Sequence, residues 1–243
     1  MEGLNPYESP RMRSVTGPAI RPGGLELTER AMSFCRFTPE ARVLDVGCGL
    51  GTTVDYLVKK HHLKAFGLDQ SAPLLREGKE KGPKLGLIRG EAEKLPLPSQ
   101  CLAGLLCECV LSLVDSPTRM LRECRRVLEP GGYLILGDIY ARNPTNALGL
   151  GHLHTHCCIK GAMGRDQVEK SVQSSGFSIL IWEDHSIFLK RLAAQLVFEY
   201  GSMAAFWATT YPGNDPAEIR PTVRQARPGY YLMVARREGE NDG

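Results

Sequence analysis

The sequence predicts an α/β fold with a mostly parallel sheet, and three observations carry this prediction. A chain of 243 residues, 42% hydrophobic and 23% charged, is long enough for one large domain with its own core. An apolar run at residues 43–46 passes through a glycine-rich loop into a helix-like segment at residues 52–60. Residues 102–109 are nearly all apolar, which is typical of a central parallel strand buried on both faces.

The first part of the chain, residues 1–24, is polar and rich in proline, glycine and arginine, which predicts a flexible N-terminal arm. Within this arm, residues 15–22 can fold over a bound ligand. We expect one domain over residues 25–243, and its first element is a helix at residues 25–37 that stops before Pro39.

The order of the following strands and helices is predicted from apolar runs, helical periodicity and turn residues. Strands are expected at residues 43–46, 65–69, 85–89, 102–109, 131–138, 177–182 and 230–235. Helices are expected at residues 52–60, 71–81, 117–128 and 165–175, with Ser71 as the N-cap of the second. A glycine-, histidine- and asparagine-rich connection at residues 142–164 is typical of a substrate lid. An insertion at residues 186–227 contains one strongly apolar helix at residues 186–207.

The loop after the first strand predicts a cationic cofactor. Backbone N–H groups are open to a ligand here because the loop alternates three glycines, Gly47, Gly49 and Gly51. Thr52 occupies the position of the third glycine of a dinucleotide fingerprint, which disfavours a nicotinamide-dependent oxidoreductase. The Asp45 carboxylate would repel a pyrophosphate but attract the amino group and sulfonium of S-adenosylmethionine. Asp69 ends the second strand, where it can bind ribose hydroxyls, although either acid alone could simply cap a helix.

These motifs resemble those of class I S-adenosylmethionine-dependent methyltransferases, in particular the methyltransferase type 11 or UbiE-like branch. The resemblance covers residues 38–177 and rests on Asp69 and on the segments DVGCGLG at 45–51, GEAEKLP at 90–96 and LRECRRVLEPGG at 121–132. It implies a doubly wound, Rossmann-like sheet of seven strands, mostly parallel, with an antiparallel last strand. The helical insertion would precede that last strand.

The resemblance also implies which residues bind S-adenosylmethionine. The methionine end would lie on Asp45, Gly47, Gly49 and Gly51, the ribose on Asp69 and Gln70, the adenine on Glu91 and Ala92, and the sulfonium beside Glu108. The catalytic residues stay unknown, because methyl transfer mainly requires that both reactants are held close and collinear.

Part of the chain resembles arsenite methyltransferases, a branch of the same superfamily. The similar segments are CECVLSL at 107–113, GDIYA at 137–141 and CIKGA at 158–162. The resemblance implies that Cys109 and Cys158 bind a trivalent metalloid substrate as thiolates, with Cys157 as a possible third sulfur. The chain departs from that branch at Glu108, where the branch has asparagine, and at residues 40–42, where the branch has a further cysteine. The alternative is that these cysteines are small core residues.

Two histidine-containing segments are further candidates. His152, His154 and His156 alternate before Cys157, so they are either polar lid residues or, less in keeping with known spacings, zinc ligands; we expect no resident metal. Residues 183–185 (Glu-Asp-His) lie where the sixth strand ends. If that strand is parallel to the first five, His185 is a catalytic candidate at the rim of the site; the alternative is a capping cluster.

Composition narrows the class of partners. Thirty basic and 27 acidic side chains leave a net charge of +3, and the basic residues are scattered rather than forming a nucleic-acid-binding stripe. The sequence has neither a signal-peptide apolar region nor 18 consecutive apolar residues, so we expect no membrane partner. Eight cysteines without a CxxC pair predict reduced thiols in the cytoplasm.

The expected protein is a cytoplasmic methyltransferase for a small-molecule acceptor, as a monomer or homodimer. A non-catalytic cofactor-binding or scaffold protein is the alternative from another class.

Overall fold

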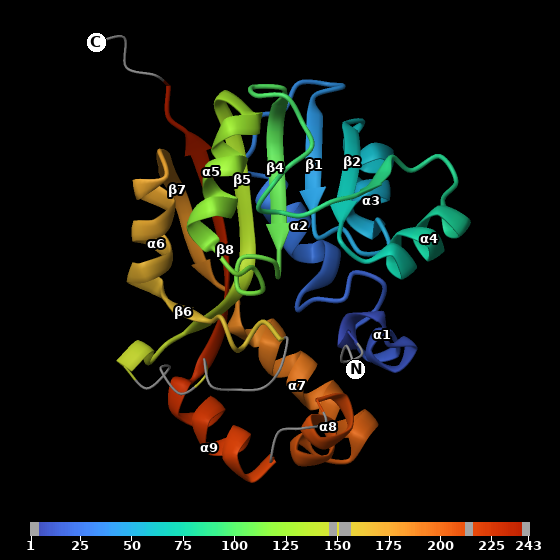
Figure 1. Ribbon diagram of the computed structural model, residues 1–243, viewed down its shortest axis with the longest axis vertical. Helices are drawn as coiled ribbons and strands as arrows, with labels where there is room; N and C mark the ends of the chain where they lie inside the picture. Colours follow the sequence, from blue (N-terminus) through green and yellow to red (C-terminus); the bar gives the residue numbers. More distant parts are fainter. Residues whose placement is uncertain (1–4, 146–149, 151–156, 212–215, 240–243) are drawn as a thin grey trace.

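The computed structural model describes residues 5–145, 150, 157–211 and 216–239. A twisted sheet with helices on both faces forms one end of the molecule, and a group of helices lies at the other end (Figure 1). The N-terminal helix α1 lies beside this second group, next to the edge at which the first strands end.

The sheet confirms the predicted α/β class and its mostly parallel strands. The strands are β1 (Arg42–Val46), β2 (Lys64–Asp69), β3 (Leu87–Arg89), β4 (Leu102–Glu108), β5 (Leu128–Ala141), β6 (Met163–Gly164), β7 (Phe177–Asp184) and β8 (Pro228–Arg237). Their order is β3-β2-β1-β4-β5-β8-β7, and the short β6, which the sequence did not predict, pairs with β5. The last strand, β8, is antiparallel to both β5 and β7, so β7 is parallel to β5 as the prediction required.

Both faces of the sheet are covered because side chains on the central strands alternate between two helical layers. The helices beside the sheet are α2 (Gly24–Met32), α3 (Thr52–His61), α4 (Ala72–Lys81), α5 (Pro117–Val127) and α6 (Arg165–Ser174). In β4, Leu105 packs in the cluster that contains residues of α5 and α6. The next residue, Leu106, packs with residues of α2 and α3. This arrangement explains why the strand sequence is almost continuously apolar.

Local capping accounts for the helix boundaries that the sequence predicted well. The Ser71 Oγ accepts a hydrogen bond from the Leu74 N–H at 3.2 Å, and Gly82 follows the last residue of α4. Helix α2 is shorter than predicted and ends at Met32 rather than at residue 37. The chain leaves the helix early because Phe34 and Phe37 pack against the core beneath the sheet, where the Phe37 ring meets Tyr133.

The insertion before β8 differs from the single apolar helix that we predicted at residues 186–207. It forms three helices, α7 (Ser186–Tyr200), α8 (Met203–Thr210) and α9 (Pro216–Ala226). The break between α7 and α8 lies at Gly201, whose φ is +81°. Ser202 then starts α8, since its side chain accepts the Ala205 N–H at 3.0 Å. This turn brings α7 and α8 together around a separate core that includes Trp207.

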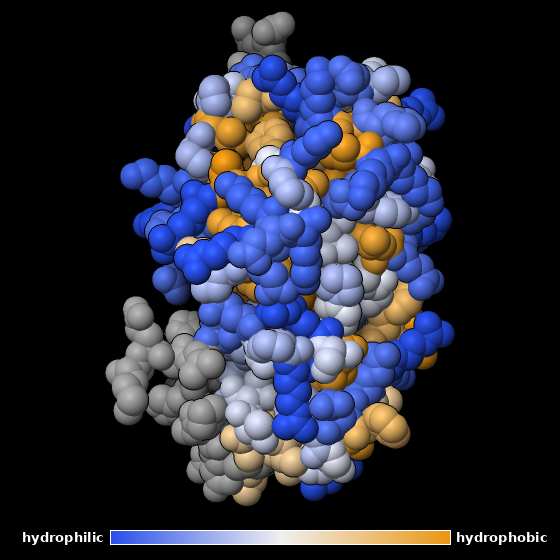
Figure 2. Space-filling model, turned by 90° about the vertical axis from the view of Figure 1, so that its right-hand side faces the viewer, coloured by the Kyte–Doolittle hydropathy of each residue, from blue (hydrophilic) through white to orange (hydrophobic). Residues whose placement is uncertain are grey.

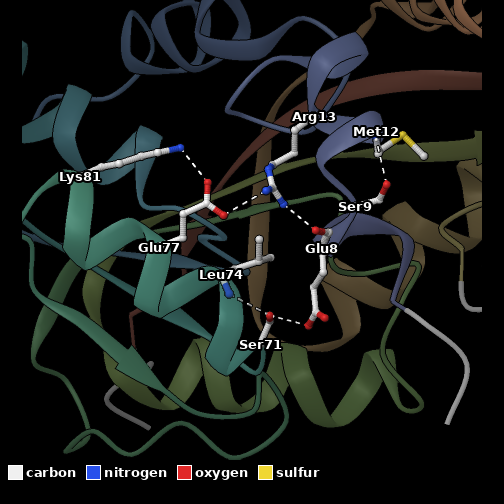
Figure 3. A network of polar contacts seen from close by, with 8 residues as sticks. All are labelled: Glu8, Ser9, Met12, Arg13, Ser71, Leu74, Glu77 and Lys81. Carbon is white, nitrogen blue, oxygen red and sulfur yellow. Dashed lines mark hydrogen bonds and ion pairs between the residues drawn. The ribbon is translucent and has the colours of Figure 1, made fainter.

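The segment expected to be a flexible arm contains two short helices over its described residues. These are η1 (Pro6–Glu8) and α1 (Pro10–Thr16). Met12 is buried in the core of the insertion, and Figure 3 shows how polar contacts join the segment to α4. The Arg13 guanidinium lies 3.0 Å from the Glu77 carboxylate, and the Ser71 hydroxyl donates to Glu8 at 2.6 Å. We call residues 5–24 the N-terminal segment below.

The surface on the side of α1, α3 and α4 is mostly hydrophilic, with apolar side chains in scattered patches (Figure 2). No helix within the described part of the chain is long and apolar enough to span a bilayer. None of the eight cysteines, all of which lie in the described residues, forms a disulfide.

Candidate functional site

A cavity of about 430 Å³ lies at the edge of the sheet where β1, β2 and β4 end. Its lining includes most of the residues that we predicted to bind a cofactor, namely Gly47, Gly49, Asp69, Gln70, Glu91, Ala92 and Glu108. Asp45 and Gly51 lie outside the lining. The N-terminal segment forms another part of the wall through Tyr7 and residues 18–21, which agrees with the expectation that residues 15–22 fold over a ligand.

The glycine loop can approach a ligand closely because its backbone adopts conformations that other residues avoid. Gly47 has a φ of +74°, and a Cβ atom placed on it would lie 2.4 Å from the Val110 side chain. The Gly49 N–H donates to the Asp69 carboxylate at 2.8 Å. The other Asp69 oxygen accepts the Ser71 N–H at 2.8 Å, so this carboxylate joins the loop to the end of β2 and the start of α4.

Two buried carboxylates lie close to the glycine loop. Asp45 is only 3% exposed, and burial, followed by the nearby charge of Glu108, raises its pKa well above the ordinary value. Burial also raises the pKa of Glu108, whereas the neighbouring Arg21 guanidinium opposes this shift. Both carboxylates would therefore be stabilised by a ligand that carries positive charge.

Arg21 is a functional candidate that our sequence interpretation missed. Its Nη2 lies 2.9 Å from the Glu108 carboxylate and 2.6 Å from the Thr28 hydroxyl, and its Nη1 donates to Thr53 at 3.0 Å. Arg21 stands in a proline- and glycine-rich stretch without periodicity. The only signal was the expectation that residues 15–22 fold over the site, which singled out no side chain.

Acidic side chains outnumber basic ones around the cavity. Five acids line it, Asp69, Glu91, Glu93, Glu108 and Asp115. Among the described lining residues, Arg21 is the single lysine, arginine or histidine. A cavity with this composition favours a ligand with net positive charge.

The two cysteines that we considered for metalloid binding lie near each other, but only one lines the cavity. Cys109 lines it with a φ of +58°, and its Sγ lies 3.3 Å from the Tyr230 hydroxyl. Cys158 packs in the same apolar cluster as Cys109, and its backbone N–H donates to the Tyr7 hydroxyl at 3.3 Å. Burial raises the pKa of both thiols, and Cys109 adds to the shift of Cys158, so both are protonated near neutral pH. Cys107, in contrast, is a fully buried residue of the sheet core.

His185 does not line the cavity. Its Nε2 lies 2.9 Å from the Glu183 carboxylate, which also binds Arg30. The neighbouring Asp184 carboxylate accepts the Ser186 N–H at 2.8 Å, two residues further on. His185 itself is the N-cap of α7, but its side chain makes no capping hydrogen bond. None of residues 183–185 lines the cavity, so the structure does not bring the catalytic candidate His185 to this site.

The candidate zinc ligands His152, His154 and His156 lie outside the described residues. Within the residues that the structure does describe, no three histidine, cysteine, aspartate or glutamate side chains converge as a metal site.

Comparisons with known proteins agree with the geometry of this edge. Residues 44–136 match the family described as a methyltransferase domain. The methyltransferase YodH of Bacillus subtilis is 34% identical over 130 residues, which are 51% of this chain and 54% of YodH. The ubiquinone/menaquinone biosynthesis C-methyltransferase UbiE of Campylobacter jejuni is 24% identical over 186 residues, covering 65% of this chain and 79% of UbiE. The chain thus spans about half the length of the first curated relatives that it matches.

Solved structures extend the similarity to nearly the whole chain. The crystal structure of the cyclase SpnF superposes with a TM-score of 0.77, covering 96% of this chain and 94% of SpnF at 21% sequence identity. At this identity the likeness establishes the fold, including the helical insertion, but not the reaction. The chain therefore resembles methyltransferases in sequence over residues 44–136, which match the methyltransferase domain family, and it shares its fold with a solved structure over nearly its whole length.

Proposed function

We propose that this protein transfers a methyl group from S-adenosylmethionine to a small-molecule acceptor. The observation that carries the proposal is the acid-rich cavity at the ends of β1, β2 and β4, which the glycine loop borders. S-Adenosylmethionine has a sulfonium and an amino group, and both positive charges suit this lining. A Cβ atom on Gly47 would lie 2.4 Å from the Val110 side chain, and one on Gly67 of β2 would lie 2.5 Å from the Cys48 Sγ, so the loop keeps its place against the sheet only with glycine at both positions.

The residues around the cavity fit the parts of the cofactor in order along the sheet edge. Asp45 and the loop glycines would hold the methionine end, and Asp69 with Gln70 would hold the ribose hydroxyls. Glu91 and Ala92 would meet the adenine, and Glu108 would lie beside the sulfonium. Support for these roles comes from their shared position along one cavity wall, except for Asp45 and Gly51, which would act from behind it.

The cofactor supplies an electrophilic methyl group on a sulfonium when it is bound. The chain's own contribution is to hold an acceptor in line with that methyl and to exclude water. The N-terminal segment closes one wall of the cavity, and Tyr7, Cys109 and Leu113 border the end that is left for an acceptor. A cavity of about 430 Å³ has room for little beyond the cofactor, which supports a small acceptor.

A thiophilic metalloid, such as trivalent arsenic, is a second candidate acceptor. The supporting observation is that Cys109, which lines the cavity, and Cys158 pack in the same apolar cluster. Two soft sulfur ligands beside the methyl donor would suit a metalloid that keeps a lone pair for methyl transfer. Binding would then require both thiols to lose their protons.

Calorimetric titration of the reduced protein with S-adenosylmethionine tests the main proposal. We expect binding at sub-millimolar concentration, and an absence of binding would contradict the proposed function.

Titration of the loaded protein with As(III) then separates the acceptors, since C109S and C158S should each abolish arsenic binding while C101S should not. If arsenic does not bind, turnover of small organic acceptors is the next assay. Cofactor binding without transfer to any acceptor would favour the non-catalytic alternative.

A further inference from the structure

We propose that Arg21 binds the carboxylate of the cofactor's methionine moiety. This inference rests on the proposed function, because it assigns one contact within the same cavity. Arg21 belongs to the N-terminal segment and lies outside residues 44–136, which match the methyltransferase family. It would be a cofactor-binding residue that none of the glycine-loop or strand-end motifs contains.

The cofactor carries a negative charge that the acidic cavity must accommodate. The methionine end of S-adenosylmethionine carries a carboxylate as well as an amino group, and five acids of the cavity lining would repel that carboxylate. Among the described lining residues, only Arg21 offers a full positive charge to it. A guanidinium also matches a carboxylate in geometry, since it can donate two parallel N–H groups.

The Arg21 side chain lies beside the start of α3, next to the glycine loop. Its Nη1 donates to Thr53, in the first turn of α3, directly after the glycine loop. Arg21 also lies near enough to Asp45 for each charge to shift the pKa of the other. A cation and an anion that lie this close together match the amino acid end of the cofactor, in which the amino group and the carboxylate share one carbon.

The Arg21 guanidinium is held in place by several contacts, but some of its N–H groups have no hydrogen-bond acceptor among the described residues. The side chain is 7% exposed, and its Nη2 contacts Glu108, Thr28 and the Gly24 carbonyl. Its Nε has no hydrogen-bond partner among the described residues, and Nη1 donates one hydrogen bond there. A buried guanidinium with unused donors is stabilised by an anionic ligand. The pair with Glu108 fixes the orientation of the guanidinium.

The test compares two cofactors that differ only in the carboxylate. Wild-type protein and R21Q are titrated with S-adenosylmethionine and with decarboxylated S-adenosylmethionine, which keeps the amino group and the sulfonium. For the wild type we expect tighter binding of S-adenosylmethionine. In R21Q its affinity should fall by about 10- to 100-fold, as for a lost hydrogen bond between charged groups, while the affinity for the decarboxylated compound changes by less than about threefold.

R13Q is the matched control, because Arg13 belongs to the same segment but pairs with Glu77 away from the cavity (Figure 3). It should change both affinities by the same factor. R21K, which keeps the charge, should recover part of the preference for S-adenosylmethionine. If R21Q does not fold because Glu108 loses its partner, R21Q/E108Q removes both charges, and the same two titrations apply.

The outcomes separate this inference from the proposed function. If R21Q weakens both compounds equally, Arg21 supports the fold of the site without binding the carboxylate, and the inference is wrong. If the wild type binds neither compound, the proposed function is wrong and the inference falls with it. If R21Q loses affinity for S-adenosylmethionine but not for the decarboxylated compound, the result supports both the inference and the proposed function.

Discussion

The buried Asp138 carboxylate is held by hydrogen bonds from backbone N–H groups and one hydroxyl. Asp138, at the end of β5, accepts hydrogen bonds from the Ser112 N–H and hydroxyl and from the Ile139 N–H. These contacts favour the charged form, but burial outweighs them and raises the pKa of Asp138 to about 6. The group connects the loop after β4, which contains Cys109, to the neighbouring strand.

The raised pKa of Asp138 predicts how stability depends on pH. Between the unfolded value of about 4 and the folded value of about 6, the folded protein binds a proton that the unfolded chain has lost. This group therefore stabilises the fold at low pH, and the free energy of unfolding falls as pH rises through that window, by about 3 kcal/mol in total. Above pH 6 to 7 its contribution is constant.

D138N removes this titration. Urea unfolding at several pH values should show that the stability of D138N relative to the wild type improves by about 2 kcal/mol between pH 4 and pH 7. D166N, which changes an exposed acid of α6, serves as the control and should follow the wild-type pH dependence. Parallel curves for D138N and the wild type would show that Asp138 titrates normally.

At the scale of single elements, α4 lies unusually close to the glycine loop. A Cβ atom on Gly78 of α4 would lie 2.5 Å from the Leu50 carbonyl oxygen, which is a backbone atom of the loop. The loop backbone can contact the helix at this point only because Gly78 has no Cβ atom. The N-cap of the same helix, Ser71, contacts both the Asp69 carboxylate and Glu8. Helix α4 therefore positions both the loop and the N-terminal segment.

G78A tests this close approach. The added methyl group must push the Leu50 backbone away, so we expect a loss of about 1–3 kcal/mol in the free energy of unfolding. Because the glycine loop moves, the affinity for S-adenosylmethionine should also fall. E80A, on the exposed side of α4, should change neither quantity by more than about 0.5 kcal/mol. A stable G78A with unchanged affinity would contradict the role of this contact.

At the scale of the whole molecule, the site is assembled from parts of the chain that are far apart in sequence. The sheet edge forms its floor, while the N-terminal segment forms a wall and packs through Met12 on the insertion helices. Cys158, from the connection after β5, touches Tyr7 of the same segment. Because the N-terminal segment forms part of the cavity wall, we expect it to move when a cofactor is released.

A variant that lacks residues 1–16 should therefore release S-adenosylmethionine faster. The deletion removes the Arg13–Glu77 and Glu8–Ser71 contacts together with the packing of Met12 on the insertion helices. The two polar contacts alone contribute about 1.4 kcal/mol, so we expect the dissociation rate to rise by about tenfold or more. Stopped-flow displacement measures this rate. E8Q/R13Q, which keeps the segment but weakens both contacts, should give an intermediate rate. Equal rates in all three proteins would show that the segment does not close the site.

The sequence by itself determined the elements whose causes are local. Apolar runs and turn residues predicted the strands, and Ser71 predicted the start of α4, because a cap depends on residues within one turn. The glycine loop and Asp69 were predicted together as well, since parallel strands place their carboxyl ends at one edge. Their roles toward a cofactor stay predictions, although the structure brings them to one cavity.

Tertiary structure decided what depends on contacts between distant segments. The apolar run at residues 186–207 reads as one helix, but it bends at Gly201 because α7 and α8 bury a shared core around Trp207. Arg21 has no local pattern, and only packing brings its guanidinium to Glu108. Periodicity and capping report on neighbours along the chain, whereas burial and charge pairing depend on neighbours in space. The sequence therefore determined the sheet and its cofactor edge, and the tertiary structure decided which residues close it.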